Sequence, residues 1–209
     1  MCRFPLDEGL EPAYYFDRHP TREDGMRRTP AQSEAVSKLI AALYGIAEGR
    51  DWFVAANFAT FRTSNPKEYP LVPDVTVFKS ISLQKLDQKN LRSWKMALPN
   101  RPLPDIVFEV SHPRNSYTDL YENPQVYGEA GIKEYFAFDP HRPLYWERAE
   151  ALVGWRNSAG GQTEEISPNA AGWLWSEKLA SWVAAEDGQL KFYDAEGKTR
   201  PIKADWYLK

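Results

Sequence analysis

The chain has 209 residues and a formal net charge of −3, with 43% hydrophobic and 26% charged residues. This composition is ordinary for a globular domain and argues against a strongly basic nucleic-acid binder, although a local basic cleft stays compatible with it. The single cysteine, Cys2, excludes an internal disulfide, and the chain has neither a membrane-length apolar run nor a signal-peptide core. We therefore expect one domain in a cytoplasmic protein.

The first predicted element is a helix that follows an arm of residues 1–28. Thr29 is suited to cap it, Pro30 fits its first turn, and apolar residues recur at helical spacing as far as Ala47. Gly49 then supplies a stop. We expect the domain to span residues 29–195 and a tail to cover 196–209.

Strand patterns follow the helix. Residues 52–62 and 71–79 predict a hairpin across a turn at Ser64-Asn65-Pro66, and residues 80–101 predict an irregular surface excursion. Two further strands, 105–110 and 134–139, flank a helical segment that ends at Gly131. This order predicts an α/β fold in which the second helix is a crossover between strands.

The last third of the chain contains short strand patterns at 144–148, 152–156 and 190–193. They predict strands that extend or cap the sheet. Trp173, Trp175 and Trp182 are expected to fill a core, because an indole buries a large apolar area, in preference to stacking on bases or sugars.

Acidic side chains inside apolar strands are the main functional signal. Asp105 and Glu109 share one strand face but lie ~13 Å apart, at ~3.3 Å per residue, so they cannot hold one metal ion. Asp105 follows a proline at a strand start, where an aspartate commonly accepts backbone hydrogen bonds. Asp74 on the preceding strand is the natural partner of Glu109, and two carboxylates on adjacent strands suit magnesium.

The order of these motifs resembles the Uma2 family. The resemblance rests on Pro73-Asp74-Val75, residues 104–110, Asp119, Tyr127, residues 131–136 and Asp139-Pro140. Uma2 proteins are similar to restriction endonucleases of the PD-(D/E)XK type. The resemblance implies an α/β, restriction-endonuclease-like mixed sheet flanked by helices, with extra C-terminal strands.

The resemblance also implies a metal-dependent endonuclease that hydrolyses DNA phosphodiester bonds. Asp74 and Glu109 match the two acids that hold Mg²⁺ or Mn²⁺, and the helix containing Glu34 matches one that sometimes supplies a third, auxiliary acid. DNA is the implied partner. A homodimer is an open alternative by analogy, because a duplex presents two strands.

One expected residue is missing from the motif. Its lysine would stand two positions after Glu109, where the chain has Ser111, or four positions after Asp119, where it has Asn123. Asn123-Pro124 also predicts a helix start with an asparagine cap. Three explanations stay open: Arg114 or Lys133 reaches in, the site works with metal alone, or catalysis is lost. The last makes the chain an impaired nuclease-fold protein that binds nucleic acid or a protein.

Overall fold

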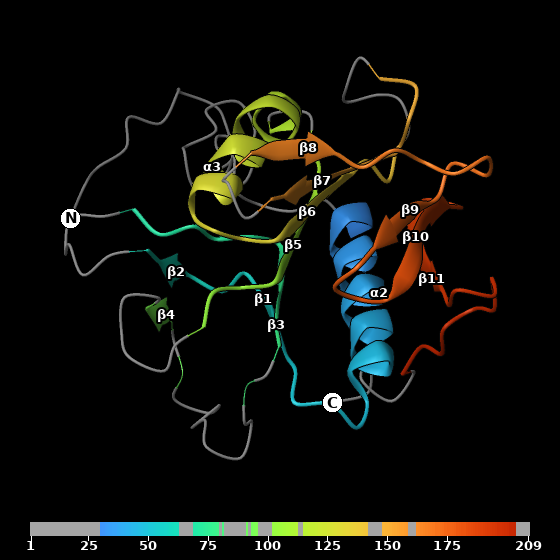
Figure 1. The fold of residues 1–209 in the computed structure, drawn as a ribbon, viewed down its shortest axis with the longest axis horizontal. Helices are drawn as coiled ribbons and strands as arrows, with labels where there is room; N and C mark the ends of the chain where they lie inside the picture. The colour runs from blue at the N-terminus through green and yellow to red at the C-terminus, as the bar shows by residue number, and fades with distance from the viewer. Residues whose placement is uncertain are drawn as a thin grey trace, which may run out of the picture.

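The computed structural model describes residues 30–62, 69–79, 81, 91, 93–95, 102–112, 115–141, 148–158 and 162–203. Its centre is a mixed six-stranded sheet with the order β1-β3-β5-β6-β7-β8 (Figure 1). The strands of this sheet are β1 Phe53–Ala56, β3 Val75–Phe78, β5 Ile106–Val110, β6 Glu134–Phe138, β7 Leu152–Asn157 and β8 Thr163–Glu165. Among the described strands of this sheet, only β5 and β6 pair in parallel, and the helical segment between them is the predicted crossover. The α/β prediction is confirmed.

Helix α2, Pro30–Ala47, packs on one face of the sheet. Its buried Val36, Leu39 and Leu43 share a core with Ile106 and Phe108 of β5. Gly49, with a φ of 70°, follows the helix in the left-handed region, as expected for a stop. Neither α2 nor any other helix in the described part of the chain combines the length and apolar character of a membrane span.

The opposite face is covered by a π-helical turn, η3 Thr118–Glu122, that leads into α3 Asn123–Glu129. Helix α3 begins at Asn123, as predicted, but the predicted asparagine cap is wrong, because the π turn directly precedes this residue and its side-chain amide donates to Asp119. Within the π turn the Asn123 N–H bonds the Thr118 carbonyl, so the next carbonyl, that of Asp119, lies opposite Pro124. A proline has no N–H to offer the Asp119 carbonyl, and the Tyr135 hydroxyl donates to that carbonyl instead, at 2.7 Å.

The predicted strand pairing forms, since β1 and β3 pair antiparallel from Phe53–Phe78 to Ala56–Val75, whereas the predicted turn at Ser64-Asn65-Pro66 lies outside the described residues. Asn57 adopts a φ of 48° and ends β1. The chain then enters β2 Thr60–Phe61, which pairs in parallel with β4 Trp94–Lys95 inside the predicted excursion. Aromatic rings link the two sheets: the Phe78 and Trp94 centroids are 4.6 Å apart.

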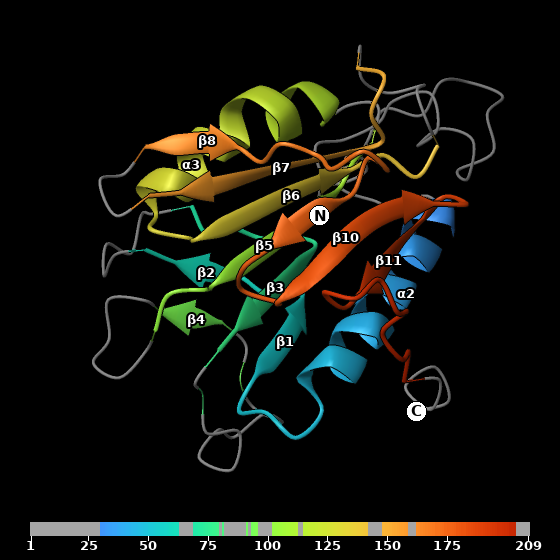
Figure 2. The same cartoon turned by 45° about the vertical axis from the view of Figure 1, so that its right-hand side comes forward.

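A second, three-stranded sheet completes the α2 side of the molecule (Figure 2). Its strands are β9 Leu174–Ser176, β10 Ser181–Glu186 and β11 Gln189–Tyr193, in the order β11-β10-β9. Leu174, Val183 and Phe192 point into the core shared with α2. Of the predicted C-terminal strands, 152–156 and 190–193 are confirmed, and 144–148 falls largely outside the described residues.

The expectation that three tryptophans fill the core is wrong. Trp173, Trp175 and Trp182 are half-buried and lie outside the core clusters. The physical reason is strand alternation, because the inward positions of β9 and β10 belong to Leu174 and Val183. The indoles therefore lie on the outer face of the three-stranded sheet.

Candidate active site

Two hydrogen bonds join Asp74, which directly precedes β3, to Glu109 and Val110 of β5. The backbone N–H of Asp74 donates to Glu109 Oε2 at 3.1 Å, and the backbone N–H of Val110 donates to Asp74 Oδ2 at 2.8 Å. The Asp74 carbonyl also accepts a bond from the Asn57 N–H at 3.2 Å. Neighbouring strands on both sides thus fix Asp74, and they bring its carboxylate beside that of Glu109.

Glu109 points toward the η3/α3 side of the sheet, as strand alternation predicts. Val107 on the same face packs with Tyr127 and Tyr135, whereas Ile106 and Phe108 face α2. The Tyr127 hydroxyl donates to Glu109 Oε1 at 2.5 Å. Each Glu109 oxygen therefore accepts one hydrogen bond, which fixes the orientation of the carboxylate.

A third acid, Asp119, reaches the same region from η3 and is 4% exposed. The Ser111 hydroxyl donates to its Oδ2 at 2.8 Å, and the Asn123 amide donates to its Oδ1 at 3.2 Å. Both residues at the two expected lysine positions are thus hydrogen-bond donors to Asp119. They supply bonds there without supplying a positive charge.

Neighbouring negative charges disfavour the ionised forms of Glu109 and Asp119. Burial, followed by the negative charges of Asp74 and Asp119, holds the pKa of Glu109 well above its usual range. Burial and the charge of Asp74 raise the pKa of Asp119 to about 7, against the opposing effect of its bonds from Ser111 and Asn123. A group of like charges of this kind is a frequent mark of a functional site, and a bound cation would relieve the repulsion.

The N-terminal helix contributes a different residue from the predicted one. Glu34 is exposed and pairs with Lys38 at 2.5 Å. Two residues earlier, the buried Gln32 donates from its amide to the Val110 carbonyl at 2.8 Å. A sequence signal was present, because Gln32 interrupts the apolar stripe that continues through Val36 and Leu39.

The described residues bring neither Asp105 nor Lys133 to the pair formed by Asp74 and Glu109. Asp105 accepts the Lys79 N–H at 2.9 Å, which confirms its backbone-bonding role. Lys133 precedes β6 and is exposed, whereas Glu109 aligns with Ala137 further along that strand, ~13 Å away at ~3.3 Å per residue. Arg114 lies outside the described residues.

Residues 23–186 match the Uma2 family, which is described as "Putative restriction endonuclease". The chain belongs to the Uma2 family. A comparison with curated proteins finds no match.

Among solved structures, the chain is similar to a protein described as "a putative nuclease belonging to DUF820" from Anabaena variabilis ATCC 29413. The TM-score is 0.51 at 16% identity, over 73% of this chain and 75% of that one. At this identity the likeness establishes the shared fold. The restriction-endonuclease-like sheet predicted for this Uma2 chain is therefore confirmed.

The Uma2 site offers two strand-borne carboxylates as ligands for a hard cation. The described residues contain no cluster of three or more His, Cys, Asp or Glu side chains suited to hold a metal ion. Two carboxylates nevertheless fit Mg²⁺, which commonly takes one or two protein ligands and fills its other positions with water or substrate phosphate. The donor set of Asp74 and Glu109 fits that chemistry.

Proposed function

We propose that this Uma2 protein is a metal-dependent nuclease that hydrolyses DNA phosphodiester bonds, with Asp74 and Glu109 as ligands of Mg²⁺ or Mn²⁺. The observation that carries the proposal is the pair of hydrogen bonds that joins Asp74 to β5, which brings two like-charged carboxylates together. Family membership and the fold of the similar nuclease support it.

The protein's own groups would hold and orient the reacting atoms. Asp74 and Glu109 bind the ion, Tyr127 keeps the Glu109 carboxylate in one orientation, and Asp119, with a pKa of about 7, can exchange a proton near neutral pH. When bound, the ion polarises the phosphate and lowers the pKa of a water molecule.

The direct test is cleavage of plasmid and linear DNA with Mg²⁺ or Mn²⁺. We expect Asp74→Ala and Glu109→Ala each to lower the rate by roughly a hundredfold or more, as for the loss of one electrostatic catalytic group. Glu34→Ala is the matched control, because this acid is exposed and paired with Lys38. Equal cleavage by wild type and both site variants would reject the assignment.

A second candidate function is binding without catalysis, and the contact between Asn123 and Asp119 favours it. This contact stands where the family pattern has a lysine, and it provides no cation to stabilise charge in the transition state. The protein would then bind nucleic acid or a protein through the same fold.

Asn123→Lys separates the two candidates. A lysine beside Asp119 restores the missing charge, so a nuclease should gain at least about tenfold in rate. Asn123→Gln adds length without charge and should gain nothing. DNA binding that needs no metal, survives Asp74→Ala and Glu109→Ala, and is accompanied by no cleavage even in Asn123→Lys would favour the binding function.

A further inference from the structure

A cavity lies beside the C-terminal sheet, in a different part of the chain from the candidate active site. Its volume is about 370 Å³, within the usual range for small-ligand pockets. It lies among the segment leading into β7, the turn before β9 and the end of β10. Alanine and glycine supply much of its wall: Ala149, Ala151, Ala171, Gly172 and Ala185. These small residues leave room beside the one aromatic ring in the described lining, Trp173.

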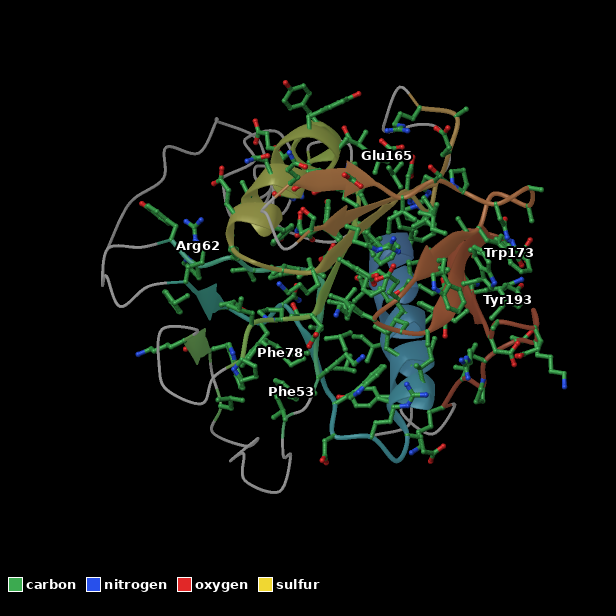
Figure 3. The ribbon with its side chains drawn as sticks, viewed as in Figure 1. Phe53, Arg62, Phe78, Glu165, Trp173 and Tyr193 are labelled. Atoms are coloured by element: carbon green, nitrogen blue, oxygen red, sulfur yellow. The ribbon has the colours of Figure 1, made fainter. Side chains whose placement is uncertain are left out.

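Trp173 is held as a flat platform. Its ring stacks on Tyr193 with centroids 4.3 Å apart and planes 2° from parallel, and Figure 3 shows the pair at the outer edge of the sheet. Trp173 is half-buried and also lines the cavity. The indole is thus immobilised by Tyr193 while part of it remains accessible.

The charged groups of the cavity wall are acidic. Glu150 is 53% exposed, and its pairing with Arg148 is a long contact of 3.4 Å. Arg148 makes shorter bonds to Glu165, at 3.0 and 2.7 Å. Glu186 is oriented by the Tyr193 hydroxyl at 2.8 Å and partly neutralised by Lys191 at 3.1 Å. The described lining contains no Lys or Arg, and the two cations beside it, Arg148 and Lys191, are each shared between two carboxylates. The net negative charge that results favours cations over phosphate.

We propose that this cavity binds the arginine side chain of a protein partner. A guanidinium is planar and stacks on an indole face, and its N–H groups match carboxylate acceptors such as Glu150 and Glu186. An ammonium lacks the flat face, and a nucleotide carries the wrong charge. The proposal is a protein-recognition function that is independent of nuclease activity at Asp74 and Glu109.

The test uses the full chain, labelled with ¹⁵N, and two small probes of nearly equal shape. Both probes are blocked at the amino and carboxyl groups, so that only their side chains differ in charge. N-acetyl-arginine amide is cationic, whereas N-acetyl-citrulline amide is neutral. The eight tryptophans give separate indole N–H signals, and Trp173→Phe identifies the one from Trp173. We expect the arginine probe to shift that signal saturably and the citrulline probe to leave it in place.

Substitution of Glu150 tests whether its carboxylate contributes to arginine binding. Glu150→Gln keeps the shape of an exposed side chain and should weaken arginine binding about tenfold, the effect of losing a charge-assisted bond. Glu196→Gln, on an exposed turn away from the cavity lining, should bind as wild type does. The proposal is overturned if arginine causes no saturable shift, if citrulline binds equally well, or if Glu150→Gln has no effect.

Discussion

Glu109 and Glu134 stand on neighbouring parallel strands, yet their surroundings have opposite charge. Glu134 is fully buried, faces Arg156 at 3.5 Å, and accepts bonds from the Ser176 hydroxyl and the Glu177 N–H. Burial raises its pKa, while these partners act to lower it. Glu109 faces Asp74 and Asp119, whose charges add to the effect of burial.

The comparison shows that a buried carboxylate in a strand is not by itself evidence of a functional site. Glu134 of β6 accepts a hydrogen bond from Ser176 of β9 and so links the six-stranded sheet to the three-stranded sheet. Glu109 lies in an acidic environment that folding alone would disfavour and that a cation would stabilise. The sign of the neighbouring charges separates a structural acid from a candidate ligand.

The largest effect should come from removing the structural acid. Glu134→Ala leaves the Ser176 hydroxyl and the Glu177 N–H without their acceptor, at about 1–3 kcal/mol for each unpaired group. Arg156 also loses an ion-pair partner but keeps its contacts with the Trp175 carbonyl and Glu177. Urea denaturation measures this loss. Glu196→Ala is an exposed control, and a loss for Glu134→Ala no larger than the control's would contradict the structural role.

The second-largest effect should be a dependence of stability on pH, to which Asp119 of the acidic site contributes. The pKa of Asp119 is raised to about 7, so its contribution to stability is complete below its unfolded pKa and is lost as the pH rises through about 7. Three pKa units correspond to an upper limit of about 4 kcal/mol. We expect metal-free protein to unfold at lower urea concentration at pH 8 than at pH 5.

Asp119→Asn supplies the control for this dependence, because asparagine keeps the shape and does not titrate. The difference between pH 5 and pH 8 should become smaller in the variant. An unchanged difference would show that Asp119 is ionised across this range, against its raised pKa.

The smallest effect, and the one of opposite sign to Glu134→Ala, should follow Glu109→Gln. Removing the ionisable group relieves repulsion from Asp74 and Asp119 and the cost of burying a charge, so metal-free protein at pH 8 should become more stable. Added Mg²⁺ should stabilise wild type and have little effect on the variant. If Glu109→Gln destabilised the protein instead, Glu109 would be a structural acid, as Glu134 is.

Much of the fold and part of the site could be predicted from local patterns. Helical spacing identified α2, and strand alternation placed Glu109 on the face opposite Phe108. The order of motifs gave the Uma2 resemblance and the pairing of Asp74 with Glu109. These are properties of neighbouring positions or of their sequence order, so they need no coordinates.

The sequence by itself determined the acids, their strand faces and the absence of a lysine at positions 111 and 123. Tertiary structure alone decided that Gln32 and not Glu34 bonds the Val110 carbonyl next to the site, that Tyr127 bonds Glu109, and that Ser111 and Asn123 both bond Asp119. It also placed Trp173, Trp175 and Trp182 outside the core. The reason is physical: a hydrogen bond or a pKa depends on groups far apart in the chain, whose approach is fixed only when sheet and helices pack together.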